Sequence, residues 1–159
     1  LGSLMSQRIA YEKTRRTLHL GVILREVGRG QRYMLCLQPA CDSVRINGEK
    51  RGFVFCELAV PGDGKPFTHV VADINRNTIK LIYKPKTSNC LILNFTTDKD
   101  SISAENSEGK FIFEDVDKNK YEWIAELRTE HAQRAAEEFG RTLSRVGLTE
   151  SEWLRLKAK

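Results

Sequence analysis

Short apolar runs separated by turn residues occupy the chain between Leu18 and Leu127. They recur about every eight to twelve residues, which is typical of antiparallel strands in a sandwich or barrel. No helical pattern alternates with them, and this argues against a doubly wound parallel sheet. The predicted strands are residues 18–27, 33–38, 52–60, 67–74, 78–84, 90–96, 110–116 and 121–127.

The turn between residues 67–74 and 78–84 is the sequence Asn75-Arg76-Asn77. Asn tolerates the left-handed conformation that a tight hairpin requires, so these residues predict a hairpin. Within residues 67–74 the even-numbered side chains are expected to form the drier face. The centre of this run, residues 70–72, is apolar on both faces, which suits a strand covered on both sides.

The apolar period changes from two to 3.6 residues in the C-terminal third. The pattern predicts a helix from about Thr129 to Val146 that Gly147 ends in a left-handed conformation. Residues 148–153 match a capping box, which predicts a short second helix over residues 150–156. The apolar stripe of the longer helix is Ala132, Ala135, Ala136, Phe139, Leu143 and Val146.

These patterns together predict an α+β fold, with a small antiparallel β-barrel or sandwich, a C-terminal α-helix and a short terminal helix. Among small barrels, an SH3-like or PemK-like one fits. We expect residues 1–3 to be a tag remnant and residues 4–17 an N-terminal helical or extended arm. Residues 18–127 would then form the β-rich domain, and residues 128–159 the C-terminal helices packed on it.

The chain of 159 residues has 26 Lys and Arg against 21 Asp and Glu, a net charge of +5. The basic surplus lies in the first sixty residues. It favours a polyanionic partner, although an ordinary solvated basic face has the same composition. No apolar run approaches the twenty or so residues of a membrane-spanning helix, so we expect a soluble protein with no membrane partner.

Four cysteines are too few for a secreted disulfide scaffold. Cys36, Cys56 and Cys90 lie inside apolar runs, where a reduced thiol behaves as a small hydrophobe. These features predict a cytoplasmic protein. The cysteine spacing is not that of a zinc site, and the common nucleotide-binding, zinc-protease and serine-hydrolase motifs are missing. We therefore predict no metal and no cofactor.

The segment Gln38–Arg45 contains the first candidate site. Pro39 must end regular strand pairing, so Cys41, Asp42 and Arg45 are predicted at a strand end. The thiol could be a nucleophile. We favour the alternative, in which Asp42 caps the turn and pairs with Arg45, because an adjacent carboxylate raises the pKa of a thiol.

The histidines His19, His69 and His131 are the candidates for acid–base chemistry. A Cys41–His69 dyad is conceivable if their strands are neighbours. The plainer interpretation of His69 is a half-buried partner for a carboxylate such as Asp73.

A second candidate site is Lys80, Tyr83 and Lys84, which places an aromatic ring among lysines at a strand end. Single-strand nucleic-acid binders use this combination, because bases stack on the ring while phosphates meet the cations. One tyrosine with nearby lysines also occurs on ordinary strand edges. Nucleic acid is therefore a possible partner.

Residues 33–45, 53–55 and 143–155 resemble the C-terminal part of bacterial response-receiver-domain proteins. The resemblance extends from about Leu18 to Leu156, and its distinctive parts are C-D-S-V-R and R-V-G-L-x-E-x-E-W-L. The chain lacks the receiver region of the longer members, including its acidic pair. The resemblance implies an output or interaction module of a signalling or defence protein, with a protein or a fused receiver domain as partner. It implies no active site.

The functional prediction from these features is a non-catalytic recognition or output module that binds a protein or nucleic-acid partner. Its predicted binding residues are Cys41, Asp42, Arg45, Lys80, Tyr83 and Lys84. The alternative is a small-barrel enzyme, such as a ribonuclease or a thiol-dependent hydrolase that uses Cys41 with a nearby histidine.

Overall fold

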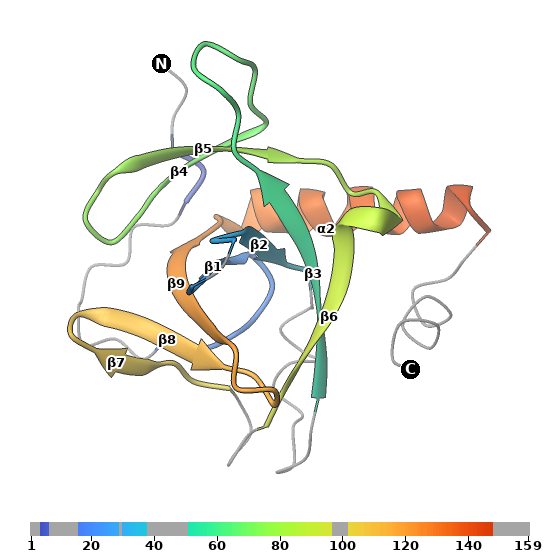
Figure 1. The fold of residues 1–159 in the computed structure, drawn as a ribbon. Helices are drawn as coiled ribbons and strands as arrows, with labels where there is room; N and C mark the ends of the chain where they lie inside the picture. The colour runs from blue at the N-terminus through green and yellow to red at the C-terminus, as the bar shows by residue number, and fades with distance from the viewer. Residues whose placement is uncertain (1–3, 7–15, 29, 38–50, 97–101, 148–159) are drawn as a thin grey trace.

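The computed structural model describes residues 4–6, 16–28, 30–37, 51–96 and 102–147. These residues form nine strands, one short 3-10 helix and one α-helix (Figure 1). The elements are β1 (Val22–Glu26), β2 (Tyr33–Cys36), β3 (Arg51–Ala59), β4 (His69–Ala72), β5 (Thr78–Tyr83), η1 (Thr87–Asn89), β6 (Cys90–Phe95), β7 (Glu105–Ser107), β8 (Lys110–Glu114), β9 (Lys120–Glu126) and α2 (Thr129–Arg145).

All paired strands are antiparallel, which together with the C-terminal helix confirms the predicted α+β class. The strand order is β4-β5-β3-β2-β1-β9-β8-β7. Strand β6 is not part of this order and pairs with β3. The described sheet is strongly bent and does not close. The β4–β5 and β7–β8 hairpins form the two ends of this strand order and lie on opposite sides of the central strands (Figure 1).

The middle of strand β3, residues 53–56, is buried on both faces, which explains why these four residues are all apolar. Phe53 and Phe55 point into an aromatic core on one side of the sheet. Val54 and Cys56 point into a second core on the other side, which α2 covers. The side chains alternate between the two cores because successive residues of a strand face opposite ways.

The aromatic core is centred on Phe95, which is fully buried. Its ring centroid lies 5.9 Å from that of Phe53, 6.5 Å from that of Phe55 and 6.2 Å from that of Tyr121. Phe95 therefore joins β6 to β3 and β9.

The predicted stripe of α2 is largely confirmed. Ala132, Ala135, Phe139 and Leu143 are buried against the sheet. Val146 lies beyond the last turn and is 57% exposed, so it is not part of the core. Gly147 has the predicted left-handed conformation, with φ at 77°. The predicted second helix and its capping box lie outside the described residues.

The strand predicted at residues 67–74 is shorter in the structure, where β4 spans His69–Ala72. The prediction that its even-numbered side chains form the buried face is wrong. Val71 is completely buried in the core, whereas Val70 and Ala72 are only partly buried. The odd-numbered residues face inward because β4 packs over α2 through that side. Apolar character alone could not indicate this, since both faces of the strand carry apolar side chains.

The hairpin between β4 and β5 forms as predicted, but with a different residue in the left-handed conformation. Arg76 has φ at 65°. The Asp73 carboxylate accepts the amides of Asn75 at 2.9 Å and Asn77 at 2.8 Å, and this capping holds the turn. Strand β7 was not predicted, because its three residues are polar and exposed.

Residues 4–6 lie between β4 and the start of α2. The Met5 amide donates to the Val70 carbonyl at 2.9 Å, and the Met5 carbonyl accepts the Arg128 amide at 2.8 Å. Ser6 Oγ accepts the Ala72 amide at 3.0 Å. The segment thereby fixes one wall of a pocket described below. Within the described ranges, no helix is long and apolar enough to cross a membrane.

Gly21 brings the start of β1 close to α2. Its φ is 95°, and a Cβ placed on it would lie 3.0 Å from Cβ of Ala132. We expect Gly21→Ala to lower the free energy of unfolding by about 2 kcal/mol, since it adds both backbone strain and a close contact. Urea denaturation measures this loss.

Gly64→Ala is the matched control, because Gly64 also has a positive φ, at 70°, but a Cβ placed on it would have nothing within 4 Å. Gly64→Ala should lower the free energy of unfolding by about 1 kcal/mol, from backbone strain alone. Equal losses in the two variants would show that the contact with α2 contributes nothing.

Candidate functional site

The structure separates the predicted residues Lys80, Tyr83 and Lys84. Both lysines are exposed, but Tyr83 faces α2 and is only 4% exposed. Its hydroxyl donates to the Ala135 carbonyl at 2.6 Å, and burial raises the pKa of this hydroxyl well above its usual range. The Tyr83 ring is therefore not available for a base to stack on. Cys41, Asp42 and Arg45 lie outside the described residues.

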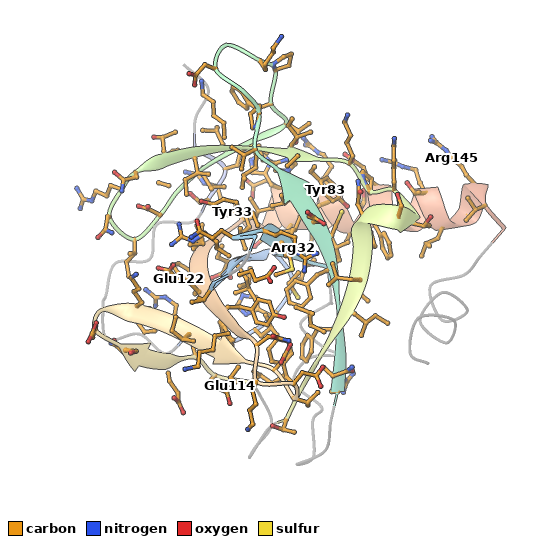
Figure 2. All side chains as sticks on the ribbon, in the orientation of Figure 1. Arg32, Tyr33, Tyr83, Glu114, Glu122 and Arg145 are labelled. Carbon is orange, nitrogen blue, oxygen red and sulfur yellow. The ribbon has the colours of Figure 1, made fainter. Side chains whose placement is uncertain are left out.

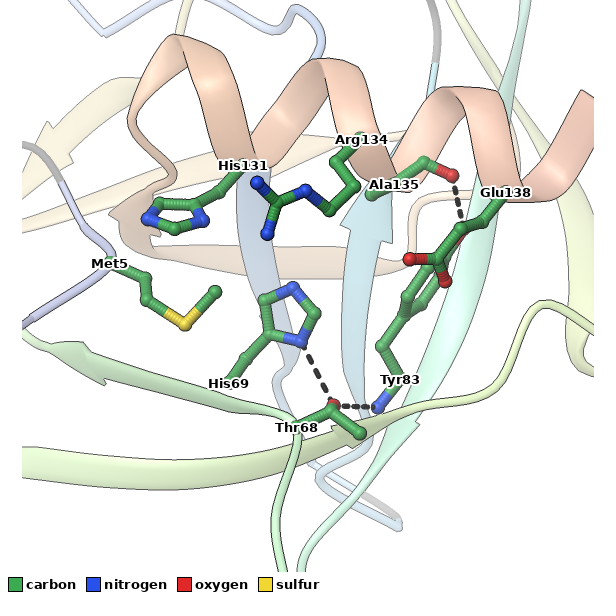
Figure 3. A pocket seen from close by; sticks show the side chains of 8 residues that line it. All are labelled: Met5, Thr68, His69, Tyr83, His131, Arg134, Ala135 and Glu138. Carbon is green, nitrogen blue, oxygen red and sulfur yellow. Dashed lines mark hydrogen bonds between the residues drawn. The ribbon is translucent and has the colours of Figure 1, made fainter. Parts of the chain in front are cut away.

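A pocket of about 170 Å³ lies between the β4–β5 hairpin and α2 (Figure 3). The strands and the N-terminal segment form one wall, and the first three turns of α2 form the other. The lining residues are Met5, Thr68, His69, Tyr83, His131, Arg134, Ala135 and Glu138. Three of the helical members, His131, Arg134 and Glu138, are spaced three and four residues apart, so they share one face of α2.

His69 projects from β4 toward the side chains of α2 (Figure 3). Its Nδ1 lies 2.9 Å from Thr68 Oγ1, and its ring packs edge-on against Tyr83 with centroids 5.7 Å apart. Burial, together with the nearby His131 and Arg134, lowers the pKa of His69 to about 4. The imidazole is therefore neutral at pH 7. The predicted carboxylate partner, Asp73, caps the hairpin instead.

His131 and Arg134 bring unpaired hydrogen-bonding groups to the pocket. Nδ1 of His131 is buried, and no described residue forms a hydrogen bond with it. A buried polar atom without a partner costs about 1–3 kcal/mol and is uncommon in native proteins. Arg134 is exposed at the rim, and its guanidinium makes no ion pair within the described part of the chain.

The two ends of the pocket differ in charge. Arg134 lies beside the two imidazoles, whereas the Glu138 carboxylate lies over Tyr83 at the other end (Figure 3). The end formed by His69, His131 and Arg134 can supply N–H donors from two walls and a full positive charge. Chemically, it can hold a small anion, and two neighbouring imidazoles can also exchange protons with a substrate.

Other charged clusters already have partners. His19 bonds to Glu126, Arg25 to Glu122 at 2.5 Å, and Arg32 to Glu26 at 2.8 Å. The Arg25–Glu122 pair links the neighbouring strands β1 and β9, and the other two join a strand to a nearby loop. Figure 2 shows Arg32 and Glu122 among the side chains of the sheet. We interpret them as structural.

Arg16 is another buried charge with partners. Its guanidinium lies 4.7 Å from the centroids of both the Phe111 and Trp123 rings. Burial lowers its pKa, which the nearby Glu126 partly offsets. Stacking between two rings is a stable place for an arginine, so this cation packs the core.

The thiols described, Cys36, Cys56 and Cys90, are free and buried as predicted. Cys56 and Cys90 are opposite each other across β3 and β6. The pKa of Cys56 is raised, chiefly by a hydrogen bond with Cys90 and to a smaller extent by burial. This thiol is therefore not a reactive one. The described residues contain no cluster of three His, Cys, Asp or Glu side chains suited to a metal ion.

Comparisons with protein-family models, with curated proteins and with solved structures found no match. The candidate site therefore rests on its geometry. The sequence marks His69 and His131 as candidates for acid–base chemistry, but nothing in it places them together. The helical spacing of His131, Arg134 and Glu138 was the available signal, because it puts three polar side chains on one stripe beside the buried alanines.

Proposed function

We propose that this domain is a non-catalytic recognition module that holds a terminal anionic group of a protein partner in the pocket between β4, β5 and α2. The observation that carries the proposal is the convergence of His69, His131 and Arg134 on one pocket. In the described structure, Arg134 forms no ion pair, and Nδ1 of His131 is buried without a hydrogen-bonding partner. An incoming oxyanion would pair with the Arg134 guanidinium at the rim.

The size of the pocket favours a single small group. Pockets for drug-sized ligands measure about 300–1,000 Å³, and a water molecule takes about 30 Å³. At about 170 Å³ this pocket accommodates one phosphoryl or carboxylate group with a few waters.

A protein partner suits this pocket better than a nucleic acid. A backbone phosphate carries sugars on both sides, which hinders its insertion into a small pocket, whereas a phosphorylated or acidic side chain ends in its anionic group. The buried ring of Tyr83 also removes the stacking surface that single-strand binders use. The resemblance to response-receiver-domain proteins points the same way, to a protein or a fused receiver domain as partner.

We further propose a particular type of barrel and a cellular location and role for this domain. The strong bend of the sheet supports a small barrel, SH3-like or PemK-like. The free, buried thiols support a cytoplasmic location. A role in signalling or defence is what the resemblance to response-receiver-domain proteins implies. We retain Cys41, Asp42 and Arg45 as a second contact for the partner, and Lys80 and Lys84 as exposed cations beside it.

A test uses three fluorescent probes: a short Gly/Ser peptide with one phosphoserine, the same peptide without the phosphate, and a single-stranded RNA. We expect only the phosphopeptide to bind, with a Kd of about 1 mM, since one small group supplies about 4 kcal/mol at most. Added sulfate should compete. Equal binding of both peptides would contradict the proposal. RNA binding that falls steeply with salt would indicate a nucleic-acid partner instead.

The second candidate is a phosphodiester-cleaving enzyme, and the specific observation in its favour is that two imidazoles line the same pocket beside an arginine. One histidine could act as base and the other as acid. The RNA probe tests this directly. Recognition predicts intact RNA after long incubation, whereas cleavage that disappears in both His69→Ala and His131→Ala would establish the enzyme.

A further inference from the structure

We propose that His69 takes up a proton when an oxyanion enters the pocket, so that the pocket binds oxyanions more tightly as the pH falls. The inference rests on the proposed function, because it requires an anion in the pocket. It adds a regulation that the proposed function does not contain, namely an affinity that rises as the pH falls toward the pKa of the free His69, about 4.

The hydrogen bonds around His69 suit an imidazolium. Thr68 Oγ1 accepts the Tyr83 amide at 2.7 Å and lies 3.3 Å from the Leu81 carbonyl, to which its own proton can be donated. The hydroxyl oxygen can then accept Nδ1–H of His69 at 2.9 Å. With Nδ1 anchored in this way, the second proton of an imidazolium lies on Nε2, on the opposite side of the ring from Thr68.

The charges that face His69 explain why it is neutral without a ligand. Arg134 and His131 approach from α2, Tyr83 from β5 is buried and neutral, and Met5 carries no charge. Among the described residues, Glu138 is the one carboxylate that lines the pocket. Burial is the larger cause and the charge of the two neighbouring basic groups is the smaller one. Together they lower the pKa of His69 to about 4.

A bound oxyanion reverses this balance. Its charge offsets Arg134 and attracts a second cation, and its oxygens accept a hydrogen bond from Nε2–H. The pKa of His69 therefore rises on binding. Binding and protonation are linked, so the affinity should rise by up to about tenfold for each pH unit between the pKa values of the bound and free forms.

Isothermal titration with sodium sulfate tests the inference, since sulfate keeps its two charges over this pH range. Titration of the wild-type protein at pH 7.5 and 5.5 compares the affinities. Titration at pH 6 in two buffers of different ionisation enthalpy gives the number of protons taken up per sulfate bound. We expect tighter binding at pH 5.5 and a net uptake of protons at pH 6, of up to one per sulfate.

Three variants identify the group that is protonated. His69→Gln keeps a polar side chain that cannot be protonated, so proton uptake should be lost, and His69→Asn is the second choice if His69→Gln does not fold. His131→Gln and Glu138→Gln are the controls. Each should retain the uptake, although His131→Gln should bind sulfate more weakly.

The outcomes separate this inference from the proposed function. Sulfate binding without proton uptake would overturn the inference and leave the proposed function standing, as would uptake that persists in His69→Gln. No sulfate binding at either pH would overturn both. Thermal unfolding of each variant shows whether it is folded under the conditions of the titration.

Discussion

Replacing Phe95 by alanine is expected to lower the free energy of unfolding by about 3–5 kcal/mol, the range for a large aromatic side chain removed from a packed core. Phe95 is 0% exposed and contacts three other aromatic rings from β3 and β9. Its neighbours belong to different strands, so they cannot close the cavity without moving the backbone. Equilibrium denaturation in urea measures the loss.

Phe67→Ala is the matched control for Phe95→Ala. Phe67 is the same residue type, but it is 43% exposed and its ring contacts the Lys80 ammonium at the surface. We expect this substitution to cost less than about 1 kcal/mol. A similar small loss from Phe95→Ala would mean that β6 does not pack against β3 and β9 as described.

Replacing Arg134 by glutamine is expected to weaken sulfate binding by about 10- to 100-fold. A hydrogen bond to a charged group contributes about 1.5–3 kcal/mol, and Arg134 is the arginine that lines the described pocket. Stability should hardly change, because Arg134 is exposed and forms no ion pair within the described ranges.

Arg141→Gln is the control for charge alone. Arg141 is exposed, lies two turns further along α2 and does not line the pocket. It should change sulfate affinity by less than about twofold, since the intervening solvent screens its charge. Glu138→Gln should act in the opposite direction and strengthen binding about two- to fivefold, because it removes the negative charge from the pocket. Equal losses from Arg134→Gln and Arg141→Gln would contradict a specific site.

The strands could be predicted because their signal is local. Apolar runs such as that of β3 are continuous in the sequence, and turns such as the one at Asp73 are marked by polar residues that cap them. The helix α2 was equally clear, since its buried residues recur with helical spacing. Strand β7 has no such signal, as three exposed polar residues pair only because β8 lies beside them.

The pocket could not be predicted, because its walls come from segments that are far apart in sequence, at residues 5, 68–83 and 131–138. Nothing near His69 indicates that it faces His131. The burial of Tyr83 is a different case. Ile79, Leu81 and Tyr83 alternate with Thr78, Lys80 and Ile82, and this alternation places Tyr83 on the inner face and Lys80 on the outer one. The sequence pattern contained that information, although the proximity of the lysines suggested a shared surface.

The most direct test of the central claim is to map amide chemical shifts of the wild-type protein while inorganic sulfate is added at pH 6. Binding in the pocket predicts that the largest changes occur at Thr68, His69, His131 and Arg134, and that they saturate. Changes spread over lysines of the surface, or changes that increase linearly with salt, would contradict an anion site between β4, β5 and α2.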